Sequence, residues 1–138
     1  MKPRINVLTL GVNDLKASVA FYQALGFETE GIVGQEFDYG AVCFFDLQSG
    51  LKLALWPRAS ISRDTGLPAD QPSATEFTLG HNVNSRDEVD AIMQSASAAG
   101  ATIVKPAIRT FWGGYAGNFQ DPDGHVWEVV WNPQMIVE

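Results

Sequence analysis

The sequence predicts an α+β fold in which one unit, a strand, a helix and three further strands (βαβββ), occurs twice within 138 residues. Strand and helix signals appear in the same order in both halves of the chain. Each predicted helix is closed by a glycine, Gly26 in the first half and Gly100 in the second, because glycine adopts the left-handed conformation after a helix at little cost. The first strands of the halves can be aligned with Val12 on Val83. Two such units are expected to curve together around a shared cavity.

The first half reads as a module over residues 4–56. A β-branched, apolar run at residues 5–12 predicts its first strand. Asn13 or Asp14 then caps a helix, whose apolar face is predicted to consist of Leu15, Val19, Tyr22 and Leu25. The three following strands are separated by glycines and expected at about residues 27–33, 37–47 and 51–56.

Residues 57–73 contain three prolines and no clear period, and they read as a long loop to a second module at residues 74–133. Together the modules form a single domain, 4–133. Ser85 and Glu88 have the spacing of a capping box, a specific signal for the start of a helix. The apolar face of this helix is predicted to consist of Val89, Ile92, Met93 and Ala96. The strands of the second module are expected at about residues 75–83, 102–108, 114–120 and 125–131.

Composition and charge restrict the partners. The formal net charge of −7 argues against nucleic acid and anionic membranes, since neither attracts an acidic surface. Cys43 is the only cysteine, so no internal disulfide forms, and we expect it to be a small core residue. Polar residues interrupt the N-terminal apolar run, and neither a signal peptide nor a membrane span is visible. A cytoplasmic protein with a small-molecule partner is expected.

Several short motifs carry a resemblance to a known family. In the first half they are residues 12–15 with Ser18, Phe21-Tyr22 and Leu25-Gly26-Phe27. In the second they are Gly100-Ala101 and residues 119–124 through Glu128. With these motifs the chain resembles the vicinal oxygen chelate superfamily: glyoxalase I, extradiol dioxygenases and bleomycin-resistance binding proteins. The resemblance implies the glyoxalase/bleomycin-resistance/dihydroxybiphenyl dioxygenase fold, a curved mixed sheet around a cavity. Because the superfamily includes lyases, isomerases, dioxygenases and pure binders, function must be argued from the site.

The resemblance also implies where a metal would bind. Metal-using members place His or Glu on the first and fourth strands of each half, and aligning Gly50 with Gly124 puts Ala54 on Glu128. The four implied positions in this chain are Val7, Ala54, Thr78 and Glu128. Only the last keeps the ligand type, because valine and alanine have no donor and a threonine hydroxyl is a poor one for Zn, Ni or Fe. We therefore expect no metal and no other cofactor.

Neither histidine is expected to replace the missing ligands. His81 lies three residues after Thr78, so alternation puts it on the opposite, helix-facing side of its strand. His125 follows the Asp121-Pro122-Asp123-Gly124 turn and is expected to be exposed.

Glu128 is the candidate catalytic residue. It stands among valines and tryptophans, and a buried carboxylate must be paired, protonated or bound to a ligand. Two interpretations stay open. Glu128 is the general acid or base of a metal-free enzyme, or it pairs with Lys52, Arg58 or Arg109.

Candidate ligand-binding residues follow from the alternation of side chains along each strand. The residues predicted to face the cavity with Glu128 are Val7, Ala54, Trp56, Thr78 and Glu76. Trp112 and Tyr115 flank a Gly-Gly pair and are placed at the lip of the cavity, although a bulged strand start with aromatic core packing explains them equally well. One of Phe44 and Phe45 also faces the cavity. An apolar lining with a few polar groups is typical of small-molecule pockets.

The leading hypothesis is a metal-independent glyoxalase/bleomycin-resistance-like protein that binds a small hydrophobic or aromatic molecule. The alternative is a metal-free lyase or isomerase that uses Glu128 as acid or base. A metal-dependent glyoxalase or dioxygenase would need ligands that the inward positions do not offer. Since 11% of the residues are aromatic, apolar surface is expected to remain outside the cavity, and a homodimer is the commonest way to bury it.

Overall fold

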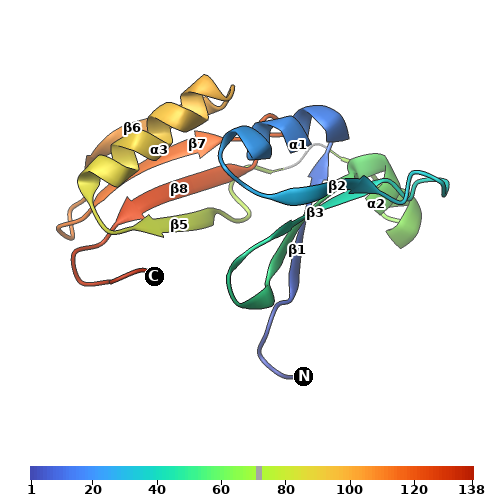
Figure 1. Cartoon of the computed structure of the whole chain (residues 1–138), viewed down its shortest axis with the longest axis horizontal. Helices are drawn as coiled ribbons and strands as arrows, with labels where there is room; N and C mark the ends of the chain where they lie inside the picture. The colour runs from blue at the N-terminus through green and yellow to red at the C-terminus, as the bar shows by residue number, and fades with distance from the viewer. Residues whose placement is uncertain (71–72) are drawn as a thin grey trace. The chain divides into compact units, whose positions relative to one another are not determined.

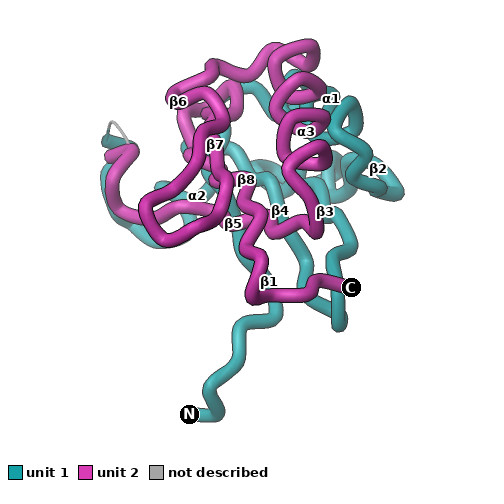
Figure 2. The backbone as a smooth tube through the Cα atoms, turned by 90° about the vertical axis from the view of Figure 1, so that its left-hand side faces the viewer, with its two compact units in different colours: residues 1–71 teal, residues 72–138 magenta. Residues whose placement is uncertain are grey.

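In the computed structural model, which describes residues 1–70 and 73–138, the chain forms two compact units, Met1–Gln71 and Pro72–Glu138 (Figures 1 and 2). They are named the first and the second module below. Each contains a four-stranded mixed sheet and a helix in the predicted βαβββ order, which confirms the α+β fold class.

In the first module the first and last strands are parallel neighbours in one mixed sheet. Its elements are β1 (Val7–Val12), α1 (Leu15–Ala24), β2 (Thr29–Val33), β3 (Val42–Asp46), a 3₁₀ turn (Gln48–Gly50) and β4 (Lys52–Pro57). The strand order is β1-β4-β3-β2, with β1 parallel to β4 and the other pairs antiparallel. The Asp14 carboxylate caps α1 by accepting a hydrogen bond from the Ala17 N–H at 3.1 Å, so that the predicted start of this helix is correct.

The predicted loop at residues 57–73 is wrong in its first part, where α2 (Arg58–Thr65) forms directly after β4. Gly66 ends this helix in the left-handed conformation, with φ of 75°. Ser60 is the one buried residue of α2, so the helix has no apolar stripe whose period could reveal it. Residues 71 and 72 of the predicted loop lie outside the described residues.

The second module repeats the arrangement. Its elements are β5 (Leu79–Val83), α3 (Arg86–Ala98), β6 (Thr102–Arg109), β7 (Tyr115–Gln120) and β8 (Val126–Trp131), in the order β5-β8-β7-β6. Ser85 caps α3 as predicted, and its hydroxyl accepts from the Glu88 N–H at 3.1 Å. The Glu88 carboxylate accepts from the N–H of Asn84, one residue earlier than in the standard capping box. The first strand is shorter than predicted, since β5 begins at Leu79.

The register of the parallel strands confirms the alignment of the modules. Val12 pairs with Pro57 in the first sheet and Val83 with Trp131 in the second. Aligning Val12 with Val83 therefore aligns Pro57 of β4 with Trp131 of β8. Three residues before these lie Ala54 and Glu128, which are aligned as the glycines predict. The modules can therefore be compared position by position.

Each sheet packs one face against a helix, α1 over β3 and β4 in the first module and α3 over its own sheet in the second (Figure 1). The fully buried Tyr22 is central to the first core and meets the rings of Phe21 and Phe27 edge to face, with centroids 5.1 and 5.5 Å apart. In the second core Phe119 stacks on Trp127 at 6.1 Å. We name the other face of each sheet its open face. None of the helices formed by the described residues has the length and apolarity of a membrane span.

Candidate functional site

The open face of the first sheet carries three of the predicted ligand-binding residues. Val7 pairs with Lys52 and Gly11 with Trp56, while Ala54 lies between Thr9 on β1 and Phe44 on β3. Paired residues of neighbouring strands point to the same face, so Val7, Ala54 and Trp56 share the open face, as alternation predicts. Phe44 joins them with 39% of its surface exposed, whereas its neighbour Phe45 is completely buried on the helix side.

A cavity of about 510 Å³ opens at the Trp56 end of this face. We name it the Trp56 pocket. Its lining combines β4, the β2–β3 loop and α2, and consists of Asp38, Tyr39, Gly40, Trp56, Ser60, Arg63 and Asp64. Its volume is within the range of roughly 300–1,000 Å³ that is usual for small-molecule sites.

Tyr39 connects the three elements of the Trp56 pocket. Its carbonyl oxygen accepts a hydrogen bond from the Trp56 indole Nε1–H at 3.2 Å. The Arg63 guanidinium lies over its ring, 4.4 Å from the centroid, in a cation–π contact. Tyr39 has a left-handed backbone with φ of 59°, a conformation that is unfavourable for a residue with a side chain. The strained backbone holds the carbonyl toward Trp56 and the ring toward α2.

Two glycines allow the β2–β3 loop to hold Tyr39 in this way. The loop closes through hydrogen bonds from the Phe37 N–H to the Gly34 carbonyl and from the Gly40 N–H to the Phe37 carbonyl, both 3.1 Å. Gly34 has φ of 79°, and a Cβ there would lie 2.3 Å from the Gly40 carbonyl oxygen. Larger residues at either glycine would force the loop apart, so the loop geometry is specified by the sequence.

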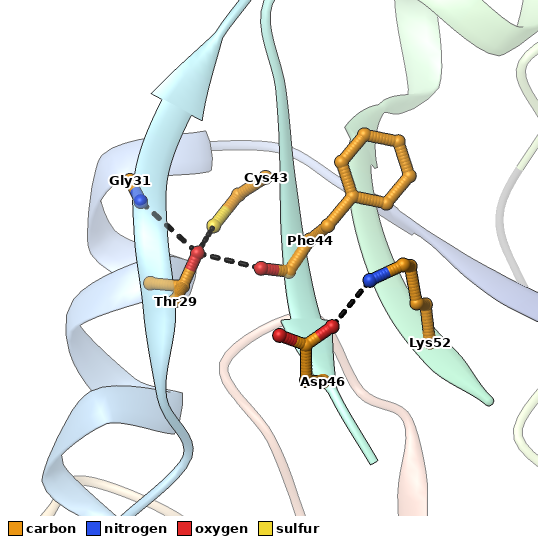
Figure 3. A network of polar contacts seen from close by, with 6 residues as sticks. All are labelled: Thr29, Gly31, Cys43, Phe44, Asp46 and Lys52. Carbon is orange, nitrogen blue, oxygen red and sulfur yellow. Dashed lines mark hydrogen bonds and ion pairs between the residues drawn. The ribbon is translucent and has the colours of Figure 1, made fainter. Parts of the chain in front are cut away.

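A second cavity, of about 330 Å³, lies toward the Lys52 end of the same sheet, and Figure 3 shows polar contacts among residues at this end. The Thr29 hydroxyl donates to the Phe44 carbonyl at 2.6 Å, accepts from the Gly31 N–H at 3.1 Å and contacts the Cys43 thiol, also at 3.1 Å. Lys52 forms an ion pair with Asp46, and this pair lies at the surface. The Thr29, Asp46 and Lys52 side chains of this cavity are therefore already engaged within the module.

Glu128 lies on the open face of the second sheet but is exposed, so the prediction of a buried carboxylate is wrong. In the register it stands between Gly80 on β5 and Asn118 on β7. These neighbours are small or polar and do not cover it. Among the described residues of the second module, none forms an ion pair or a side-chain hydrogen bond with its carboxylate. Of the basic residues considered as partners, Lys52 is paired with Asp46, and Arg58 donates to the Asn13 side chain at 2.6 Å.

Other predicted site residues of the second module are placed differently. Glu76 is exposed in a bend before β5, and Thr78 is exposed directly before this strand, so alternation within a strand does not apply to them. Tyr115 lies on the helix side of the sheet, where its hydroxyl donates to Asp90 of α3 at 2.7 Å. The hydrogen bond to Asp90 raises the pKa of the Tyr115 phenol. The predicted position of Tyr115 at the lip of an open cavity is therefore wrong. Trp112 is 44% exposed at the β6–β7 turn.

The structure places both histidines beside residues other than Glu128. His81 pairs with Val129 on the helix face, as predicted. Partial burial lowers the pKa of His81, and the nearby Glu88 opposes this shift. His125 is half-buried rather than exposed, and its ring stacks on Phe77 with centroids 6.2 Å apart.

The residues at the implied metal positions do not fit a metal. Val7 and Ala54 offer no donor atom, and the Glu128 carboxylate stands beside a glycine and an amide. Across residues 1–70 and 73–138, no three His, Cys, Asp or Glu side chains come together as a metal site would require. One carboxylate is too few, because catalytic zinc sites use three protein ligands.

Sequence reasoning missed most of the Trp56 pocket, apart from Trp56 itself. Asp38 and Tyr39 lie inside a predicted strand, and Arg63 and Asp64 inside a predicted loop. The available signal for the first pair was Asp38-Tyr39-Gly40, since aspartate and glycine around one residue favour a turn over a strand. For the second it was Gly66, the glycine that ends α2.

Comparison with known proteins agrees with this architecture. The model of the Glyoxalase/Bleomycin resistance protein/Dioxygenase superfamily matches residues 4–129. A glyoxalase-related enzyme from Fulvimarina pelagi is similar, with 31% sequence identity and a TM-score of 0.82 over 99% of this chain and 93% of that chain. A glyoxalase/bleomycin resistance protein/dioxygenase from Nocardioides shows 29% identity and a TM-score of 0.75 over 95% of this chain and 84% of that chain. The comparison with curated proteins gave no match.

Proposed function

The chain belongs to the Glyoxalase/Bleomycin resistance protein/Dioxygenase superfamily, and we propose that it is a metal-independent member that binds a small hydrophobic or aromatic molecule on the open face of its first sheet. The observation that carries this proposal is the Trp56 pocket, a cavity of about 510 Å³ with an indole in its wall. Its lining combines the rings of Tyr39 and Trp56 with charged and polar side chains, so the rings supply apolar contact area and the other groups can orient an organic ligand.

The lack of donor side chains supports binding without a metal. Three of the four implied metal positions carry Val7, Ala54 and Thr78. A metal-dependent glyoxalase or dioxygenase would need a different set of ligands. Elemental analysis of protein purified without a histidine tag tests this part of the proposal, and stoichiometric Ni, Zn or Fe would contradict it.

A thermal-shift screen of hydrophobic and aromatic compounds, followed by calorimetry, tests ligand binding. We expect Trp56→Ala to weaken binding at least about tenfold, equivalent to about 1.4 kcal/mol. Trp112→Ala is the matched control, because it removes the same side chain from the exposed β6–β7 turn. Equal affinity of the intact protein and Trp56→Ala would contradict the proposed site. Loss of binding in Trp112→Ala alone would instead move the site to the second module, where the sequence predicts a ligand contact for Trp112.

The second candidate function is that of a metal-free lyase or isomerase, and it is favoured by the exposed Glu128 carboxylate. An acid–base residue must be free to reach its substrate. Among the described residues of the second module, no side chain forms an ion pair or hydrogen bond with the Glu128 carboxylate. With a ligand from the screen that is converted, Glu128→Gln should lower turnover by about 10²-fold or more while leaving affinity nearly unchanged. Unchanged turnover would leave Glu128 without a catalytic role.

We also propose that the protein is a homodimer. Apolar side chains on the open face of the first sheet remain accessible in the single chain, including Val7 at 45% and Phe44 at 39% exposure. Two-fold pairing is the commonest way to cover such surface. Light scattering at micromolar concentration should give about twice the chain mass of 15.0 kDa. A mass that stays at one chain with rising concentration would contradict the dimer.

A further inference from the structure

The Trp56 pocket carries two carboxylates that nothing in the fold requires. Asp38 is on the β2–β3 loop and Asp64 on α2, so different elements bring the two acids to one cavity. Both are exposed, and among the described residues neither forms an ion pair or a side-chain hydrogen bond. Neither side chain caps a helix. Their negative charge is therefore available to a bound molecule.

The one basic residue among the lining side chains, Arg63, is already engaged. Its guanidinium lies 4.4 Å from the centre of the Tyr39 ring and forms no salt bridge with either aspartate. The lining therefore has two negative groups and one positive group. The chain as a whole carries a net charge of −7, which adds a long-range attraction for cations.

The aromatic walls are suited to the same type of ligand. A cation over an aromatic ring is attracted by the negative face of the ring, and tryptophan gives the strongest attraction. Arg63 on Tyr39 shows that one wall of the pocket already accepts a cation. The Trp56 indole is fixed by its hydrogen bond to the Tyr39 carbonyl, so the second wall has a defined orientation. A ligand that offers an ammonium group to these walls is not repelled by the aspartates.

We propose that the Trp56 pocket selects organic cations, in which an ammonium or guanidinium group is carried on an aromatic or apolar body. This inference rests on the proposed function and specifies the ligand class for the same site. The second module supports it by contrast, because the position aligned with Trp56 is Val130 and the β6–β7 turn is short. The cation-selective features occur where α2 and the long loop add to the common fold.

Three probes of matched size and different charge test the inference: 2-phenylethylammonium, 2-phenylethanol and phenylacetate. Their dissociation constants are measured by NMR titration on the indole N–H signal of Trp56, which Trp56→Phe assigns. We expect the cation to bind at least about tenfold more tightly than the alcohol, and phenylacetate to bind most weakly.

Two charge variants with a matched control make the test specific. Asp38→Asn with Asp64→Asn should weaken binding of the cation at least tenfold and leave the alcohol unchanged. Glu28→Gln with Glu36→Gln removes the same charge from exposed positions of the first module that do not line the pocket, and should have a small, salt-dependent effect. Arg63→Gln should tighten binding of the cation, since it removes a like charge and frees the Tyr39 ring. A site for anions would respond to Arg63→Gln in the opposite direction.

The outcomes separate this inference from the proposed function. Equal affinity for the cation and the alcohol, both lost in Trp56→Ala, would overturn the cation selectivity while supporting the binding function. The same conclusion follows if none of the three probes binds but the wider screen yields a ligand that depends on Trp56. If no compound binds more weakly to Trp56→Ala than to the intact protein, both the cation selectivity and the proposed binding function are overturned.

Discussion

The two modules place the same residue type at one helix-facing position and different residue types at the neighbouring open-face positions. The aligned registers bring Phe45 of β3 onto Phe119 of β7, both almost completely buried beneath their helices. One residue earlier, Phe44 aligns with Asn118. The corresponding open-face pairs on the fourth strands are Ala54 with Glu128 and Trp56 with Val130. Packing against a helix restricts one face of each sheet, while the other face has diverged.

The ends of the strands differ as well. The first module has a loop at residues 34–41 between β2 and β3, and α2 after β4. The second has a tight turn in which the Thr110 hydroxyl accepts from the Gly114 N–H at 2.8 Å. Its chain continues after β8 into a segment held by Asn84, whose side chain exchanges two hydrogen bonds with the backbone of Val137, at 2.6 and 2.8 Å. The first module thus gains a pocket from these additions, whereas the second gains a C-terminal segment that is tied to the residue following β5.

The largest effect is expected for the shared core position. Phe45→Ala and Phe119→Ala should each lower the free energy of unfolding by about 3–5 kcal/mol, because each deletes a buried ring and leaves a cavity. Phe44→Ala, on the open face, should cost at most about 1 kcal/mol. Urea denaturation monitored by circular dichroism measures all three. A cost for Phe44→Ala equal to that for Phe45→Ala would contradict the assignment of faces.

The next largest difference in stability is expected between substitutions in the β2–β3 loop and in the β6–β7 turn. Gly34→Ala and Gly113→Ala both place a side chain on a left-handed backbone, with φ of 79° and 93°, which costs roughly 1–2 kcal/mol. A Cβ at Gly34 would also meet the Gly40 carbonyl oxygen at 2.3 Å, while a Cβ at Gly113 meets nothing within 4 Å. We expect Gly34→Ala to cost at least about 1 kcal/mol more, the lower range for overpacking. Thermal unfolding of the two variants makes the comparison, and equal losses would refute the close approach.

The helix caps should give similar, smaller effects in the two modules. Asp14→Ala and Ser85→Ala each remove the side chain that accepts from a first-turn N–H, at 3.1 Å in both cases. Each should destabilise by about 0.5–2 kcal/mol. Asp14→Asn and Ser85→Thr keep an accepting oxygen and serve as controls that should retain most of the stability. If alanine is tolerated as well as these replacements, the caps contribute nothing measurable.

The smallest effect concerns pH, and it should be confined to the second module, which holds both histidines. Partial burial lowers the pKa of His81 in the folded state, so below the ordinary value of about 6.5 the unfolded chain binds the proton more readily. Stability is therefore complete above that value and falls as the pH decreases toward the folded pKa. His81→Gln should remove this component of the loss between about pH 7.5 and 5.5. Urea titrations at both pH values check it, and an unchanged pH dependence in the variant would contradict the shift.

Sequence alone predicted the features that depend on repetition. The βαβββ order, the helix caps at Asp14 and Ser85, and the shared face of Val7, Ala54 and Trp56 all follow from alternation, periodicity and local hydrogen-bonding chemistry. These signals lie within a few residues of the element that they specify, so one sequence is sufficient to read them.

The predictions that failed depend on contacts distant in sequence. The helix α2 has no apolar stripe because it covers one end of an open face instead of packing into a core. The apolar strand neighbours of Glu128 predict a buried carboxylate, but Gly80 and Asn118, its cross-strand neighbours, leave it exposed. The glycines beside Tyr115 predict a position at a cavity lip, whereas its orientation is set by Asp90, 25 positions away.

Cys43 makes the first module observable on its own. The thiol is completely buried beside the Thr29 hydroxyl, and it is the only cysteine in the chain. A thiol reagent can label it only while the core between α1 and this sheet opens, so the labelling rate in native buffer reports how often the first module opens. The second module is silent in such an experiment. Ligands of the Trp56 pocket should slow the labelling, because they bind the folded first module and so lower the population of its opened state.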